Sequence, residues 1–321
     1  MKDLLKGPMA KTVTLKQLRV IAAIAKNGKI TGAANDLGVT PPAVALQLKL
    51  LEDNVGLALF NRSPAGLRPT DAGFFIMEIE SRIAATLNEC DEGLRQMKGL
   101  GRGRISVALV STSKYFAPRA LAAFARNNPS IEFELLVGNR DETINALTEF
   151  RADIAIMGRP PTTIKLERQV IGDHPHVIIC RPDHPLAERR QVTLRSLMDD
   201  VFLLREKGSG TRILADKLFA KSDVEPRVGM ECGSNETIKQ AVMAGLGVAL
   251  ISAHTIAAEI SEGRLAVLNV RGLPIIRKWH VLRMKAKRLL PAGQALWTFL
   301  TKDGARFLPD ALEPDVDGST H

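Results

Sequence analysis

The chain has 321 residues, a hydrophobic content of 45% and a formal net charge of +9 at pH 7. This length suggests two or three domains, and the composition is ordinary for a soluble protein that buries real cores. A basic chain favours an anionic partner such as nucleic acid or a phosphorylated ligand, although many soluble proteins are basic without such a partner.

Secretion, membrane insertion and metal binding are not expected. Residues 1–13 lack the apolar core of a signal peptide, and no stretch reaches the roughly 18 apolar residues of a membrane helix. The cysteines Cys90, Cys180 and Cys232 are far apart and have no metal-ligand spacing. We therefore expect a cytoplasmic protein with no membrane partner, in which each cysteine is a small core residue.

Residues 14–70 have the pattern of a DNA-binding module. Apolar residues recur at helical spacing over 15–26 and over 30–37, and a third helix is expected over 41–52. Two helices joined by a tight turn, the second with polar outer positions, are typical of a helix-turn-helix, whose second helix enters the DNA major groove. Two packed helices of an ordinary helical domain are the alternative.

The turn of this motif has residues suited to helix ends. Gly38 ends one helix because glycine adopts the left-handed conformation without strain. Pro41 suits the first position of the next helix, and Thr40 is expected to cap it. The inward positions of that helix are then Val44, Leu48 and Leu51.

Residues 57–70 read as a hairpin, the wing of a winged helix-turn-helix. Phe60 and Leu67 anchor it, and Arg62 and Arg68 flank its tip, where a wing would meet backbone phosphates. Residues 11–70 contain eight Lys/Arg and three Asp/Glu, a net charge of +5. Positive charge of this size matches phosphate neutralisation, the sequence-independent part of DNA affinity.

A long helix is expected over residues 71–98. Its apolar positions repeat every seven residues in two offset rows: Ile76, Ile83, Cys90 and Met97, with Leu87 and Leu94 between them. Two apolar positions per heptad favour pairing as a coiled coil, so we expect homodimerisation through this helix. The alternative is that the helix packs on its own domain.

Beyond a Gly/Arg-rich hinge at 99–104, strand and helix patterns alternate. Strands are expected at 105–110, 131–137 and 152–157, with helices between them. This βαβαβ series predicts a parallel sheet with helices on both faces.

A second group of elements follows, with strands at 177–180, 201–204, 229–232 and 245–252 and a helix starting at Ile213. A returning strand at 279–284 and a closing helix at 292–300 complete a two-lobed clamshell. Lobe I is expected to comprise 105–173 and 277–308, lobe II 174–276, and the acidic tail 309–321 to lack fixed structure.

The loops at the carboxyl ends of these strands are where ligands collect in α/β sheets. They offer hydroxyls, helix N-termini and the cations Lys114, Arg140 and Arg159, and one of these loops starts at Gly158. Helix N-termini with cations favour a carboxylate or phosphate, so we expect a cleft for a small anionic metabolite. The alternative is that the loops are only caps and turns.

An enzyme and a solute-binding transport protein are the competing classes. The sequence contains no nucleophile elbow, phosphate loop or dinucleotide fingerprint, so no catalytic residues are expected. His174, His176 and His184 fit no metal pattern, and Pro175, Pro182 and Pro185 are expected to break their segment into turns. A transport protein would share the lobes but needs an export signal, not a DNA-binding half.

The combined motifs resemble the LysR-type transcriptional regulators. The resemblance runs from about Thr12 to Leu308 and is carried by residues 14–73, ending Leu-Arg-Pro-Thr-Asp-Ala-Gly73, by the loop 205–212 and by Ala-Gly-Leu-Gly-Val248. Three stretches, 113–118, 156–161 and 233–240, look like the branch that controls the Calvin-cycle ribulose bisphosphate carboxylase operon. A LysR-type regulator of another metabolic operon is the alternative.

The resemblance implies a winged helix-turn-helix, a dimerisation helix and a two-lobed α/β effector domain like that of periplasmic binding proteins. It implies a homodimer or homotetramer that binds inverted-repeat promoter DNA, engages RNA polymerase and acts as an activator. A bound effector, a phosphorylated or carboxylated metabolite, then changes how DNA is bent. No other cofactor is implied.

Site residues follow position by position from the resemblance. The DNA-facing residues are Thr31, Thr40, Pro42, Gln47 and Lys49, with Arg62 and Arg68 on the wing. The effector contacts are Ser111, Thr112, Ser113, Arg140, Arg159, Ser209, Thr211 and Asn235, to which the strand-end loops add Lys114 and Gly158. Many family members have Gln and Ser where Pro41 and Ala45 stand, so we expect wing, phosphate and DNA-shape contacts to carry much of the site preference.

Overall fold

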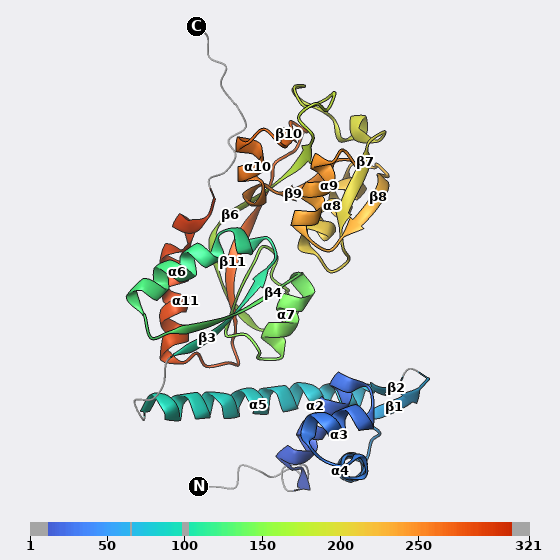
Figure 1. Ribbon diagram of the computed structural model, residues 1–321, viewed down its shortest axis with the longest axis vertical. Helices are drawn as coiled ribbons and strands as arrows, with labels where there is room; N and C mark the ends of the chain where they lie inside the picture. Colours follow the sequence, from blue (N-terminus) through green and yellow to red (C-terminus); the bar gives the residue numbers. More distant parts are fainter. Residues whose placement is uncertain (1–11, 65, 98–102, 310–321) are drawn as a thin grey trace. The chain divides into compact units, whose positions relative to one another are not determined.

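Three short helices and a hairpin begin the computed structural model, which describes residues 12–64, 66–97 and 103–309 (Figure 1). The chain divides near Leu94 into two units. The first contains α2 (Leu15–Asn27), α3 (Ile30–Leu37), α4 (Pro41–Val55), β1 (Phe60–Ser63) and β2 (Gly66–Pro69), and most of α5 (Asp71–Met97).

The helix ends of the first unit follow local chemistry. The Thr14 side chain and Gln17 form a capping box at the start of α2. Gly38 ends α3 at φ 63°, as expected, and Pro41 occupies the first turn of α4. Thr40 stands at the N-cap position of α4, but its side chain makes no capping hydrogen bond, so that expectation was wrong. The core buries Val44, Leu48 and Leu51, the three positions predicted to face inward.

The wing is fixed to the helices by backbone contacts. The Leu67 N–H donates to the Gly28 carbonyl at 2.8 Å, and the Leu59 N–H donates to the Glu52 carboxylate at 2.8 Å. Gly66 has φ +118°, and a Cβ there would lie 2.4 Å from the Gly28 carbonyl oxygen. Glycine is therefore required where the hairpin meets the turn between α2 and α3.

The heptad residues of α5 divide into two groups. Ile76 is buried and Ile83 partly buried in the core of the first unit, whereas Leu87 and Leu94 are 43% and 49% exposed. The N-terminal half of the predicted seam thus packs on its own domain, and homodimerisation stays a prediction for the C-terminal half. Cys90 is exposed, so the expectation of a core cysteine was wrong there. Residues 98–102, most of the predicted hinge, lie outside the described residues, and Arg104 already belongs to a strand.

In the second unit, lobe I is built on three parallel strands. These are β3 (Arg104–Val110), β4 (Glu132–Gly138) and β5 (Ile154–Met157), with β3 between the other two. One face of the sheet packs against α6 (Ala117–Asn127) and α11 (Pro291–Asp303), and the other against α7 (Arg140–Thr148) (Figure 1). The predicted parallel sheet with helices on both faces is confirmed.

Two long antiparallel strands connect the lobes. β6 (Leu166–Cys180) pairs along the whole of β11 (Ile275–Met284); β11 also pairs with β5 of lobe I, whereas β6 pairs with β9 and β10 of lobe II. The predicted lobe boundary at residues 173 and 174 therefore falls inside a strand. Pro175 does not break this segment, because it lies within β6 opposite Ile276, so the expected turn was wrong there. Pro182 and Pro185 do lie in turns, as expected.

Lobe II packs helices on both sides of its short strands. The strands are β7 (Val201–Arg205), β8 (Arg227–Cys232), β9 (Ala249–Ser252) and β10 (Ala266–Leu268), and the helices are α8 (Gly210–Lys221), α9 (Asn235–Met243) and α10 (Ala257–Ser261). The β10 strand was not predicted, and α8 begins three residues before Ile213. Most of the predicted tail, 310–321, lies outside the described residues. Among the described helices, none is both long and apolar enough to cross a bilayer.

Two glycines of α5 form a matched test of packing at the wing. A Cβ at Gly73 would lie 2.2 Å from the Leu59 carbonyl oxygen, whereas a Cβ at Gly93 meets nothing within 4 Å. We expect Gly73→Ala to destabilise the first unit by about 1–3 kcal/mol through overpacking. Gly93→Ala, its control, should stabilise the helix by up to about 1 kcal/mol. Calorimetric unfolding of the full chain measures both, and equal stability of the two variants would contradict the packing argument.

Candidate functional site

The outer face of α4 carries the predicted DNA-facing residues. Pro42 and Lys49 are exposed and lie seven residues apart, on the same face as Leu46, which is 55% exposed. Gln47 is partly buried beside this face, and Thr31 and Thr40 are exposed at the starts of α3 and α4. Sequence reasoning missed Leu46, although an apolar residue among polar outer positions was a visible signal. An exposed leucine on a recognition helix can contact a thymine methyl group.

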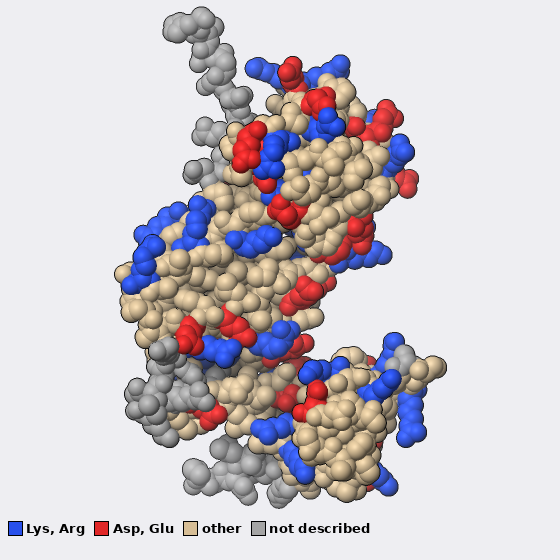
Figure 2. Space-filling model, in the orientation of Figure 1, with Lys and Arg blue, Asp and Glu red and all other residues tan. Residues whose placement is uncertain are grey.

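The wing presents its two arginines from opposite faces. Arg62 pairs with Leu67 and Arg68 pairs with Asn61 across the hairpin, and successive residues of a strand point to opposite sides. Both arginines are exposed, and Lys and Arg side chains gather at this hairpin (Figure 2). A hairpin with cations on both faces can meet phosphates on either side of a groove.

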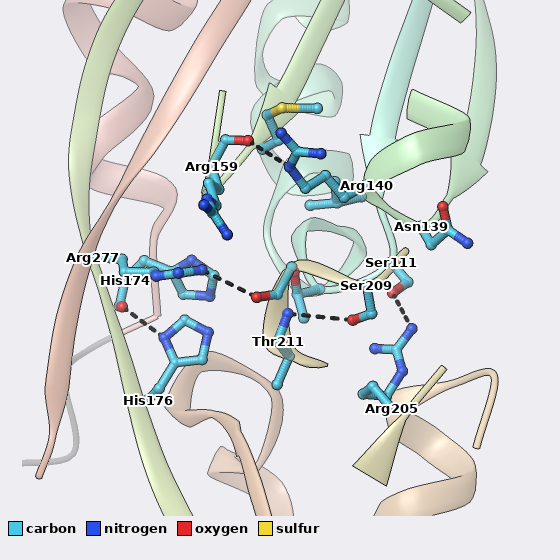
Figure 3. A pocket seen from close by; sticks show the side chains of 15 residues that line it. Ser111, Asn139, Arg140, Arg159, His174, His176, Arg205, Ser209, Thr211 and Arg277 are labelled. Atoms are coloured by element: carbon cyan, nitrogen blue, oxygen red, sulfur yellow. Dashed lines mark hydrogen bonds between the residues drawn. The ribbon is translucent and has the colours of Figure 1, made fainter. Parts of the chain in front are cut away.

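In the second unit, a cavity of about 400 Å³, including its mouth, lies between the two lobes (Figure 3). The carboxyl ends of β3 and β5, the N-termini of α7 and α8, and the crossing strands β6 and β11 surround it. Among the described residues that line it there are four arginines, two histidines and no Asp or Glu. They are Val110, Ser111, Thr112, Asn139, Arg140, Met157, Gly158, Arg159, His174, His176, Arg205, Ser209, Gly210, Thr211 and Arg277.

Most of the predicted effector residues meet at this cavity. Those that line it are Ser111, Thr112, Arg140, Gly158, Arg159, Ser209 and Thr211. Asn235 is buried one step behind them, where its Oδ1 accepts from Arg205 at 2.6 Å.

Two predicted effector residues do not line the cavity. The Ser113 hydroxyl is buried and donates to the Val110 carbonyl at 2.8 Å. Lys114 is exposed and lies over the Tyr115 ring at 5.3 Å. Both lie in a short 3-10 turn after β3, which carries their side chains away from the cavity.

The lobe II side of the cavity is rich in hydroxyls. Ser209 is the N-cap of α8 and accepts from the Thr211 N–H at 3.3 Å. Arg205 is 3% exposed, and its guanidinium donates to both oxygens of Glu206, at 2.7 and 2.9 Å. It also donates to Ser111 across the lobes at 3.4 Å. Because a carboxylate already neutralises Arg205, that residue holds the cavity wall and adds little net charge to the cavity.

The opposite end of the cavity concentrates positive charge. Arg140 donates from Nε to the Arg159 carbonyl at 3.1 Å and pairs with Asp141, a 59% exposed carboxylate, at 3.0 Å. Arg159 Nη1 is buried and has no hydrogen-bond partner. Arg277 donates to the Gly210 carbonyl at 3.2 Å, and burial, followed by Arg159 and Arg140, lowers its pKa to about 10. Three guanidiniums facing one cavity favour an anion between them.

Behind Arg277 lies a buried stack of aromatic rings. His174 stacks on Trp279 at a centroid distance of 3.8 Å, and its Nε2 is 2.9 Å from the Ser252 hydroxyl. The Trp279 indole N–H donates to His254 Nδ1 at 3.1 Å, which fixes that nitrogen as an acceptor. A Cβ at Gly158 would lie 2.5 Å from His174 Nδ1, so glycine is required for this ring to reach the cavity wall.

Burial keeps these imidazoles neutral. It lowers the pKa of His176 to about 3 and that of His254 to about 4, and the pKa of His174 also lies well below its ordinary value. Among the described residues, no group of three or more His, Cys, Asp or Glu side chains is arranged to hold a metal ion. The cavity wall combines neutral imidazoles with four arginines, and the arginines supply the hydrogen-bond donors and positive charge needed to hold an anion.

Family models match both units of the chain. Residues 98–305 match the LysR substrate binding domain, and residues 15–74 match the bacterial regulatory helix-turn-helix protein of the lysR family. The chain belongs to the LysR family of transcriptional regulators. The predicted fold class, a winged helix-turn-helix followed by an α/β effector domain, is confirmed.

Relatives within the LysR family are similar over nearly the whole chain. The HTH-type transcriptional regulator CbbR of Xanthobacter flavus is 50% identical over 97% of both chains. The RuBisCO operon transcriptional regulator of Allochromatium vinosum is 39% identical over 92% of this chain and 97% of its own length. The regulatory domain of Synechocystis CcmR, solved in complex with 2-PG, is 38% identical with a TM-score of 0.60, and covers 62% of this chain and 96% of its own.

Sequence reasoning about this LysR-family chain missed part of the cavity. Asn139 directly precedes Arg140 in a loop expected at the cleft, and Arg205, the last residue of β7, directly precedes another; neither side chain was assigned a role. Arg277, His174 and His176 gave a weaker signal, because they come from strands and not from loops. For the two histidines the available sign was their alternation: residues 174 and 176 point to the same face of β6.

The buried histidines make the stability of the second unit depend on pH. The unfolded chain takes up protons below about pH 6.5, whereas His254 stays neutral in the folded state down to about pH 4. The contribution of the neutral histidines to the free energy of unfolding is therefore fully present above pH 6.5. It is lost as pH falls through this window, by about 1.4 kcal/mol per pH unit for each such histidine.

His254→Asn should remove one of these contributions while its Oδ1 still accepts from Trp279. Both tryptophans of the chain, Trp279 and Trp297, lie in the second unit, so fluorescence-detected urea unfolding reports on this unit. We expect the variant to lose less stability than the wild type between pH 6.5 and 5. Parallel pH profiles would contradict this assignment.

Proposed function

We propose that this chain is a cytoplasmic regulator that controls carbon-fixation genes in response to a small anionic metabolite. Support for the target genes comes from relatives named as CbbR and as a RuBisCO operon regulator. The chain would bind inverted-repeat promoter DNA as a homodimer or homotetramer joined through α5 and would engage RNA polymerase as an activator. The exposed Leu87 and Leu94 are suited to helix pairing.

We infer that Thr31, Thr40, Pro42, Gln47 and Lys49 face the DNA, with Leu46 beside them and Arg62 and Arg68 on the wing. Pro42 and Leu46 have no side-chain hydrogen-bonding group, so this helix reads bases mainly through apolar contact. The register on the duplex then depends on phosphate contacts from Lys49 and the wing, and on DNA shape.

One observation carries the effector part of the proposal: the interlobe cavity is lined by four arginines and by hydroxyls, and among its described lining residues there is no carboxylate. Such a cavity suits an anionic ligand and disfavours a cationic or apolar one. The regulatory domain of CcmR was solved with 2-PG, a small phosphorylated carboxylate. We propose a ligand of this class for the present chain, acting as a signal and not as a substrate.

The DNA-binding part predicts a specific salt dependence. Lys49→Ala and Arg68→Ala should each remove one phosphate contact and lower the slope of log affinity against log salt by about one. Fluorescence anisotropy with a fragment upstream of a RuBisCO operon, titrated with salt, measures the slope. Lys221→Ala, an exposed lysine at the end of α8, is the control of equal charge. Slopes that do not differ from that control would contradict the assignment.

The effector part predicts that 2-phosphoglycolate raises the unfolding temperature of the second unit and changes the footprint on the promoter. A ligand present at 100 times its Kd should stabilise the folded chain by about 2.7 kcal/mol. Differential scanning calorimetry and DNase footprinting test this. If no phosphorylated or carboxylated metabolite in a panel has either effect, the effector proposal fails, while DNA binding can still stand.

A further inference from the structure

The positive charge in the interlobe cavity is unevenly distributed. Arg205, at the hydroxyl-rich side, is saturated by Glu206, Asn235 and Ser111. At the other end, Arg159 and Arg277 have no carboxylate partner among the described residues, and Arg140 shares only an exposed one. The net charge available to a ligand is therefore concentrated in one corner, where Arg140, Arg159 and Arg277 approach one another.

The geometry of this corner suits a group with more than one charge. Arg159 leaves a buried Nη1 without a partner, and the two other guanidiniums approach from α7 and β11, on different sides (Figure 3). A phosphoryl group has three oxygens and up to two negative charges, so it can accept from donors in several directions, whereas a carboxylate is planar and carries one charge.

We propose that Arg277 completes a phosphoryl-binding corner with Arg140 and Arg159, and that the effector binds with its phosphate there. The rest of the ligand, a carboxylate or hydroxyl, then faces the opposite group: Ser111, Thr112, Ser209 and Thr211. This inference rests on the proposed function and adds the orientation of the ligand and the residue that selects phosphate.

Arg277 is held for this role by the strands that connect the lobes. It lies on β11 opposite His174 of β6, and its Nη1 reaches the first residue of α8. The His174–Trp279 stack fills the space behind it with neutral rings, so the positive charge at this side of the cavity comes from the guanidiniums. A phosphate on Arg277 therefore touches a side chain that already bonds to lobe II.

Calorimetric titration of the full chain with matched ligands, in a buffer free of phosphate and sulfate, tests the assignment. 2-Phosphoglycolate carries both groups, diglycolate replaces the phosphate with a second carboxylate, and glycolate lacks it. We expect the wild type to prefer 2-phosphoglycolate over diglycolate by about 100-fold, and Arg277→Gln to reduce that preference below about tenfold. Arg271→Gln, an exposed arginine six residues earlier, removes the same charge and should leave the preference unchanged.

The unfolding temperature of the ligand-free chain gives a second readout, because replacing an arginine with a purely structural role would not raise it. Removing one of three crowded guanidiniums relieves repulsion, so Arg277→Gln and Arg159→Gln should unfold at a higher temperature without ligand and gain less from 2-phosphoglycolate. Should Arg277→Gln fail to fold, Arg159→Gln carries both tests, because the Arg159 side chain forms no ion pair with the described residues and its Nη1 has no hydrogen-bond partner. Arg277→Lys keeps the charge.

The possible outcomes separate the two proposals. If no ligand binds the wild type, the effector part of the proposed function fails. If the ligands bind and Arg277→Gln behaves like Arg271→Gln, the proposed function stands and the phosphoryl corner is wrong. An equal affinity of the wild type for 2-phosphoglycolate and diglycolate would also overturn it.

Discussion

The antiparallel pairing of β6 with β11 is the constraint on which the effector domain depends. Both strands continue from one lobe into the other: β11 extends the sheet of lobe I beyond β5, and β9 and β10 of lobe II pair with β6. The fully buried Trp279 lies on this pair and stacks on His174, which fills the space between the strands and the cavity. A cavity built on shared strands keeps its floor fixed while the loops of the two lobes can approach or separate.

Polar contacts join the two lobes at the cavity. The Tyr115 hydroxyl of lobe I donates to Glu236 of lobe II at 3.1 Å. Behind it, Lys239 is 3% exposed and held between Glu236 and Glu259. The Tyr115–Glu236 and Arg205–Ser111 bonds thus join the lobes through polar groups. A single hydrogen bond contributes only about 0.5–1.5 kcal/mol net, so in the proposed function a ligand held by both lobes would compete with these bonds on equal terms.

The parts of the fold with strong periodicity were predictable from sequence, and the exceptions have physical causes. Val44, Leu48 and Leu51 follow helical spacing, and the glycine-terminated helices follow from Gly38. In contrast, Pro175 suggested a turn, but it lies in a strand whose pairing partner starts a hundred residues later, at Ile275. The seam of α5 suggested pairing throughout, but Ile76 is buried by the hydrophobic core of its own unit. Tertiary contacts, which local pattern does not contain, decided both cases.

The candidate site shows the same division. Ser209 and Arg140 are loop or helix-start residues, and strand-end reasoning finds them. Arg277 stands in the first half of β11, where Arg277 and Lys278 interrupt the apolar pattern and make the strand appear to begin at Trp279.

This interruption of the apolar pattern is informative, because a partly buried cation inside a strand lowers the free energy of unfolding of the ligand-free domain. Arg277 is half-buried near two other guanidiniums, so the ligand-free cavity is electrostatically strained, and an anion relieves that strain in proportion to its charge. A sensor built in this way responds to ligand charge as well as to shape. A ligand can shift the lobes only if it binds one arrangement of them more tightly than another, and in the proposed function the charge of the ligand, as well as its shape, supplies that difference.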